Sequence, residues 1–141
     1  MEPDRTEGIR RVLRGILALG LAGIALDLLL IEHYEGVLQL PALGMLVLSG
    51  VALAWHAWSP GPPAARAFQG VMLLMLMTGA VGAGLHFRGN MEFQLEVDPS
   101  LGGFALLEKV ARATAPPLLA PFNMTLLGLV GLASIYRGGR S

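Results

Sequence analysis

Four stretches of about twenty mostly apolar residues dominate the sequence, at positions 12–31, 40–58, 67–87 and 118–136. The hydrocarbon core of a bilayer is about 30 Å thick, and a helix needs about 20 apolar residues to cross it. Backbone amides surrounded by lipid must be hydrogen-bonded within the segment, so each stretch is predicted to be a helix rather than a strand. The sequence therefore predicts an all-α polytopic membrane protein, a four-helix transmembrane bundle forming one domain over residues 1–141.

Composition supports this class and argues against others. Hydrophobic residues make up 54% of the chain and charged residues 14%, whereas soluble domains average about 45–50% apolar and about 25% charged. The net charge is zero, so no basic surface favours a nucleic-acid partner. Cysteine is absent, which excludes disulfides, thiolate metal sites and cysteine nucleophiles. No phosphate-binding loop, nucleophile elbow or paired zinc motif occurs, so a non-enzymatic role is favoured over an enzyme.

The distribution of basic residues predicts the orientation. Cytoplasmic loops of membrane proteins carry an excess of lysine and arginine. With four crossings, seven of the ten basic residues fall on one side and three on the other. The seven are Arg5, Arg10, Arg11, Arg14, Arg66, Arg137 and Arg140, and the three are Arg88, Lys109 and Arg112. Both termini are therefore predicted to be cytoplasmic.

The long outer connection, residues 88–117, predicts a structured cap. It begins with "MEFQLEVD", where apolar and polar residues alternate, a period that predicts a short extended segment. "DPSLGG" then predicts a turn. "FALLEKVARAT" repeats apolar residues at three-to-four spacing, as expected of an amphipathic helix lying on the outer membrane surface.

Polar side chains gather where the predicted spans reach the outer face. His33 follows the first span and His86 ends the third, so both are expected at similar depth. Asp27 lies about 6 Å inside the hydrocarbon and is expected to face the bundle interior, because an ionisable residue within a span is costly and usually functional. Asn123, His86 and Arg88 are its candidate partners. The other polar residues predicted at this outer mouth are Glu32, Tyr34, Glu35, Asn90, Glu92 and Glu96.

Two interpretations of this mouth remain open. Imidazole and carboxylate groups can bind zinc, iron or copper, and helix bundles often build such sites; alternatively, His33 and His86 could be the axial ligands of a haem. The candidate metal ligands are His33, His86, Glu92, Asp27, Glu32 and Glu35. The simpler interpretation is that these groups cap helix ends, pair Arg88 with an acid and solvate the interface, because amphipathic side chains are common at that level.

Two further patterns have alternative explanations. Many of the 19 glycines lie within spans, where small residues let helices approach closely, either inside the bundle or against another subunit. His56 lies between Trp55 and Trp58 at the inner end of the second span, which is typical of an aromatic belt at the membrane interface.

The chain resembles small four-span membrane proteins of bacteria. The likeness lies in "IEHYEGVLQL", "GLHFRGNMEFQLEVDPSLGG" and "ATAPPLLAPFNM", and its most specific part is "LHFRGNMEFQLE". It implies the four-span fold and a place in the bacterial inner membrane, but no particular reaction. The positions it singles out are His33, Tyr34, His86, Gly89, Asn90, Glu92, Phe93 and Glu96.

These observations lead to a ranked set of hypotheses. The preferred one is a small non-enzymatic subunit or accessory protein, embedded in the lipid bilayer and bound to other membrane subunits or to copies of itself. The second is a metal- or haem-binding membrane protein. The third is an enzyme or carrier for a lipid or quinone that enters between helices.

Overall fold

The computed structural model describes residues 2–32, 34–114, 117 and 119–136, with the side chains of residues 2–4 excepted. The described part of the chain is all-helical and contains no strand. Its five helices are α1 (Glu2–Leu30), α2 (Leu40–Trp58), α3 (Pro62–Val97), α4 (Gly103–Ala111) and α5 (Phe122–Ile135). Three of them, α1, α2 and α3, are long and apolar enough to cross a membrane. The all-helical membrane-type fold agrees with the sequence prediction.

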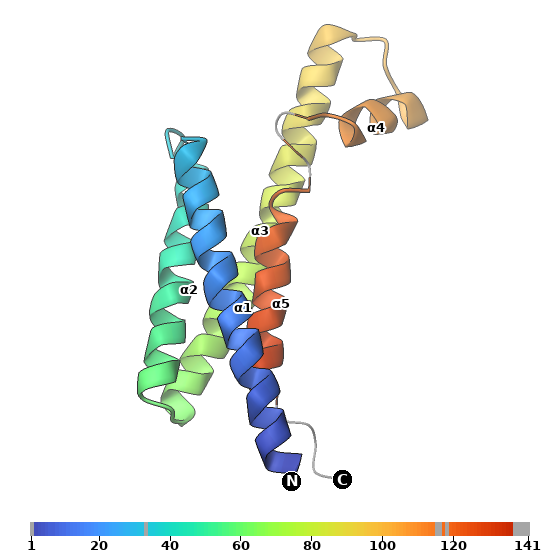
Figure 1. Ribbon diagram of the computed structural model, residues 1–141. Helices are drawn as coiled ribbons and strands as arrows, with labels where there is room; N and C mark the ends of the chain where they lie inside the picture. The colour runs from blue at the N-terminus through green and yellow to red at the C-terminus, as the bar shows by residue number, and fades with distance from the viewer. Residues whose placement is uncertain (1, 33, 115–116, 118, 137–141) are drawn as a thin grey trace.

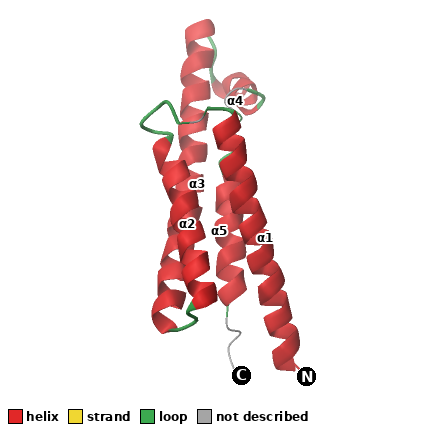
Figure 2. Cartoon of the chain, turned by 60° about the vertical axis from the view of Figure 1, so that its left-hand side comes forward, coloured by secondary structure: helices red, strands yellow, loops and turns green. Residues whose placement is uncertain are grey.

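Four of the helices pack side by side as a bundle, in which α3 contacts both α2 and α5, and α1 also contacts α5 (Figure 1). The short α4 packs only against α3 among the helices. It lies at the end of the bundle where α1 turns into α2, and Figures 1 and 2 both show it level with that turn. We call this the cap end. The opposite end, which holds the start of α1 and the α2–α3 turn, is called the terminus end.

The α1–α2 and α2–α3 connections are tight turns. Pro41 lies in the first turn of α2, and Pro62 and Pro63 lie in the first turn of α3. Proline is favoured there because the first amides of a helix have no intrahelical partner. Glu32, in the α1–α2 turn, has a positive φ of 54°, a left-handed conformation that reverses the chain within a few residues.

Helix α3 is much longer than a membrane crossing requires, and it overturns the predicted extended segment. Residues 91–97 of "MEFQLEVD" are the last two turns of this helix. The alternation was misleading because Asn90, Met91, Gln94 and Leu95 are also the covered positions of a helical face. Met, Glu, Gln and Leu are good helix formers, and Arg88 pairs with Glu92 one turn away. The helix ends at Val97, and Asp98 is extended, because the residue before a proline disfavours helical geometry.

Helix α5 is shorter than the predicted fourth span. It contains 14 residues, a length of about 21 Å against a hydrocarbon thickness of about 30 Å. The predicted span, 118–136, also includes the turn at 119–121, which ends in Pro121, and position 118, which lies outside the described residues. The fourth crossing therefore stays a prediction.

The contact between α3 and α5 is built on small residues. A Cβ added at Gly79 would lie 2.6 Å from the backbone nitrogen of Thr125, and one at Gly128 would lie 2.8 Å from the carbonyl oxygen of Met72. The hydroxyl of Thr125 also donates to the carbonyl oxygen of Leu76 across this interface, at 3.2 Å. Such close backbone approach is how helices associate in lipid, so these glycines serve packing within the bundle.

The bundle core is apolar and methionine-rich. Met72 and Met75 are fully buried, and flexible thioethers fill irregular gaps of this kind. The core residues are Leu17, Leu21, Leu46, Ala52, Phe68, Met72, Met75, Met124 and Leu127. Many large apolar side chains outside this core are exposed, including Leu19, Val47 and Leu74, which is compatible with a helical membrane protein.

Candidate functional site

His86 is the best-defined polar group near the cap end. Its half-buried ring lies on α3, and Nδ1–H donates to the carbonyl oxygen of Pro117 at 2.9 Å. A carbonyl can only accept, so the neutral ring carries its proton on Nδ1 and leaves Nε2 as an acceptor or potential metal ligand. The bond ties the segment leading into α5 to the middle of α3. His86 thus has a structural role in the fold.

The residues that follow His86 occupy successive turns of the same helix, which passes through Gly89 without a break. Asn90, one turn after His86, is buried and is 1% exposed. Arg88 Nε donates to Glu92 Oε1 at 2.7 Å on the outer surface of the helix. Glu96 is exposed one turn further on. The predicted pairing of Arg88 with an acid is therefore present, and its partner is Glu92.

Asp27 was predicted to face the bundle interior, but its side chain is exposed. The residues of α1 that pack inward are Leu17, Leu21, Ile24, Ala25 and Leu28. Asp27 immediately precedes Leu28, and one residue corresponds to about 100° of rotation about the helix axis. Its carboxylate therefore points away from the core, towards the surface that lipid or another subunit would cover.

The other predicted members of the mouth lie apart on the surface. Glu32, Tyr34 and Glu35 are exposed in the α1–α2 turn, and Asn123 is exposed in the first turn of α5. His33, the residue on which the paired-histidine hypothesis depends, lies outside the described residues. Within the described ranges, no three His, Asp or Glu side chains lie close enough to hold a metal ion. The metal and haem hypotheses stay predictions.

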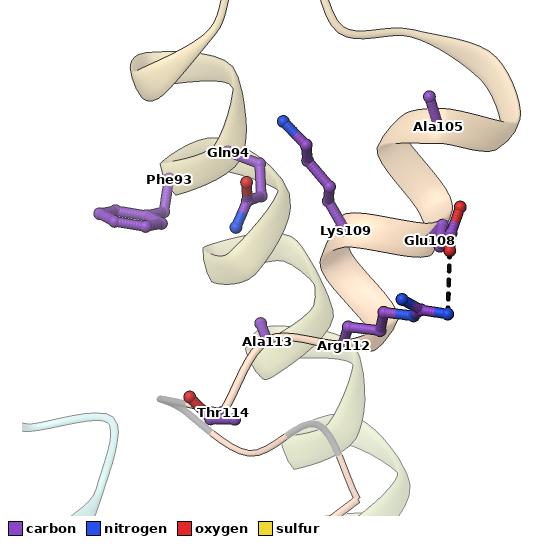
Figure 3. Close-up of a pocket in the computed structure, with 8 residues that line it drawn as sticks. All are labelled: Phe93, Gln94, Ala105, Glu108, Lys109, Arg112, Ala113 and Thr114. Atoms are coloured by element: carbon purple, nitrogen blue, oxygen red, sulfur yellow. Dashed lines mark ion pairs between the residues drawn. The ribbon is translucent and has the colours of Figure 1, made fainter.

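A cleft of about 530 Å³ lies where α4 folds back against the end of α3. Gln94 and Lys109 occupy the gap between the two helices, whereas Phe93 points away from α4 (Figure 3). Arg112 Nη2 donates to Glu108 Oε1 at 3.1 Å along α4. The cleft is lined by Phe93, Gln94, Ala105, Glu108, Lys109, Arg112, Ala113 and Thr114. Its polar side chains could orient a peptide segment or a polar headgroup.

The same region carries exposed apolar side chains, which the sequence analysis did not identify as a group. Phe104 is 80% exposed, Val97 66% and Phe93 58%. Leu107, one turn after Phe104 on α4, is half exposed. Val110, by contrast, is buried. We call Phe93, Val97, Phe104 and Leu107 the apolar cap residues. The spacing of Phe104 and Leu107 at i and i+3 could have indicated a second apolar face of α4.

At the terminus end, Trp58 is 87% exposed. The half-buried ring of His56 stacks on Phe68, with ring centroids 5.4 Å apart. The aromatic belt at a membrane interface stays a prediction.

Comparisons with protein-family models, curated proteins and solved structures find no match to this chain. Its function must therefore be argued from its own residues.

Proposed function

We propose that this chain is a small integral membrane subunit or accessory protein that binds a partner membrane protein through its cap. The observation that carries the proposal is the group of apolar cap residues, which α3 and α4 hold at the cap end. These side chains are exposed on different parts of the cap, and exposed apolar side chains gathered at one end of a protein favour a surface that another molecule covers.

The length of α3 supports a position of Phe93 and Val97 beyond the lipid, if the crossing begins near Pro62 at the terminus end. Phe93 lies about 46 Å along the helix from Pro62, at about 1.5 Å per residue, and the hydrocarbon core is about 30 Å thick. Phe93 and Val97 are therefore exposed to water unless a partner covers them. Burying a phenylalanine side chain contributes about 1.5–3 kcal/mol. Burial of Phe93 and Phe104 against a partner would therefore supply a substantial part of the free energy of binding.

Asp27 supports the same proposal. A carboxylate on the outside of a membrane helix is unfavourable by about 2.5–3.5 kcal/mol at the bilayer centre and by less near the interface. A hydrogen-bonding group on a neighbouring subunit would remove that cost. In the proposed arrangement the cap lies outside the cytoplasm, following the excess of arginine at the terminus end.

The test is purification of the tagged full-length chain from its native membrane in mild detergent. We expect a second membrane protein to co-purify with the wild type and with Glu96→Gln, a control on the exposed surface of the same helix extension. We expect it to be lost from the double variant Phe93→Ser, Phe104→Ser and weakened in Asp27→Leu. Circular dichroism checks that each variant keeps its helical content.

Two outcomes contradict the proposal. One is a wild-type chain that purifies alone as a monomer from native membranes. The other is a partner that the double variant retains as well as Glu96→Gln does, because the apolar cap residues would then contribute nothing. Two differently tagged copies distinguish self-association from a different partner.

A further inference from the structure

A second polar site lies at the terminus end, between α1 and α2. These two helices contact each other over only part of their length, and a cleft of about 410 Å³ opens between them. It is lined by Glu7, Arg11, Arg14, Leu53 and Ala57. One wall is therefore charged and belongs to α1, while the other is apolar and belongs to α2.

The charged wall on α1 has an excess of positive charge, because among the described residues Glu7 is the single acid beside several arginines. Arg14 is paired with Glu7, and its Nε donates to the carbonyl oxygen of Arg10 at 3.3 Å. Arg10 lies 4.0 Å from the same carboxylate and donates from Nη2 to the carbonyl oxygen of Tyr136 at 2.8 Å. One acid thus faces three guanidinium groups when Arg11 is included.

Arg11 is the available cation of this group. It lines the cleft and makes no ion pair or side-chain hydrogen bond with any described residue. Guanidinium groups match phosphate oxygens with two parallel N–H donors. The first ligand oxygen in the cleft would therefore meet an unused donor and an uncompensated charge.

Two buried polar atoms at the same end of the bundle, in residues that do not line the cleft, also lack a partner among the described residues. They are Nε of Arg10 and Nδ1 of His56. Arg14 and Glu7 are the charged neighbours of the His56 ring, so this nitrogen belongs to the same cluster. Buried polar groups in folded proteins are usually hydrogen-bonded, so these two atoms agree with a polar ligand or ordered water at this end of the bundle, while the site itself is defined by Arg11 and Arg14.

We propose that this cleft binds the phosphate of an anionic phospholipid, with Arg11 as its main contact and Arg14 as the second. The apolar side chains of Leu53 and Ala57 would line the path of the acyl chain. Basic pockets between membrane helices bind anionic headgroups in this way. The inference requires the bundle to lie in a bilayer and does not depend on the partner proposed for the cap.

The test is native mass spectrometry of the full chain in detergent, titrated separately with phosphatidylglycerol, phosphatidylcholine and inorganic phosphate. We expect phosphatidylglycerol to bind the wild type more tightly than phosphatidylcholine does. Arg11→Gln should weaken it by about tenfold, because the lost contact is charge-assisted. The control Arg5→Gln removes the same charge from the same helix, outside the cleft, and should change affinity less than twofold.

A second variant separates the site from general electrostatic attraction. Ala57→Phe keeps every charge but fills the cleft, and it should abolish the preference for phosphatidylglycerol. Equal effects of Arg11→Gln and Arg5→Gln, or equal binding of both lipids, would overturn the proposal. Inorganic phosphate that binds as tightly as the lipid would overturn the lipid assignment, because the apolar wall would then be irrelevant.

Discussion

Individual glycines in this bundle have different roles, although the sequence presents them alike. Gly79 and Gly128 lie where α3 and α5 touch, and a Cβ at either position would collide with backbone atoms of the other helix. Gly70 and Gly84, on the same helix α3, have no atom within 4 Å of an added Cβ. Gly79 and Gly128 therefore determine how closely α3 and α5 approach each other, whereas Gly70 and Gly84 do not.

We predict that Gly79→Ala destabilises the protein by about 1–3 kcal/mol, the usual cost of overpacking. The new methyl group would lie 2.8 Å from the carbonyl oxygen of Pro121, and backbone cannot rotate away as a side chain can. The matched control is Gly84→Ala, which should be neutral or stabilise the helix by up to about 1 kcal/mol. Thermal unfolding in detergent, followed by circular dichroism, measures both. Equal melting temperatures for the two variants would contradict this account.

At the scale of the elements, the end of α3 and the turn into α4 are stabilised by hydrogen bonds between Asp98 and Ser100. Asp98 is the last residue before Pro99, and its Oδ1 accepts hydrogen bonds from the Ser100 hydroxyl at 2.6 Å and the Ser100 amide at 3.1 Å. These bonds lower the pKa of the Asp98 carboxyl, since they favour its charged form. The turn therefore depends on an ionised side chain.

The sign of the pH dependence follows from this lowered pKa. Its stabilising effect is present above the unfolded pKa of about 3.9 and is lost as the pH falls through the folded value. We predict that the protection of the Ser100 amide against hydrogen exchange, relative to its intrinsic rate, is constant above about pH 4 and falls as the pH is lowered further. In Asp98→Asn the protection should not change over this range. A parallel fall in the variant would show that another group is responsible.

The elements also show where sequence patterns mislead. The helix α4 was predicted from its apolar spacing and is present at Gly103–Ala111. The alternation at 91–98 predicts an extended segment, but residues 91–97 are helical, with Met91 and Leu95 partly covered and Phe93 and Val97 exposed on other sides of the helix. What decided between an extended segment and a helix was continuity with the long helix before it and the Arg88–Glu92 pair.

For the whole molecule, the central question is which helices cross the membrane. The sequence has no cysteine, so single cysteines can be introduced at chosen positions and labelled with a reagent that does not cross the bilayer. We predict that cysteines at Glu35 and Ser100 are labelled from one side, and those at Arg5 and Ser59 from the other. Tyr136→Cys should behave like Arg5→Cys if α5 completes a fourth crossing.

This experiment has clear contradictory outcomes. Labelling of Glu35→Cys and Ser100→Cys from opposite sides would exclude paired crossings by α2 and α3. Labelling of Tyr136→Cys from the side of Ser100→Cys would show that α5 does not cross the membrane. The hydrogen bond from Arg10 to the Tyr136 carbonyl holds the end of α5 beside the start of α1. We therefore expect Tyr136→Cys to be labelled from the same side as Arg5→Cys.

The sequence by itself determined the helical class, the apolar centres of the three long helices and the short helix of the cap, because these depend on hydrophobicity and spacing within one segment. It did not determine the full lengths of α1 and α3, which begin earlier than the predicted spans, and α3 also ends later. Only the tertiary structure decided which glycines lie at an interface, that Asp27 points outward, and that Arg11 lines a cleft between α1 and α2. Those properties depend on how each helix is rotated about its axis, which is set by contacts between segments far apart in the chain.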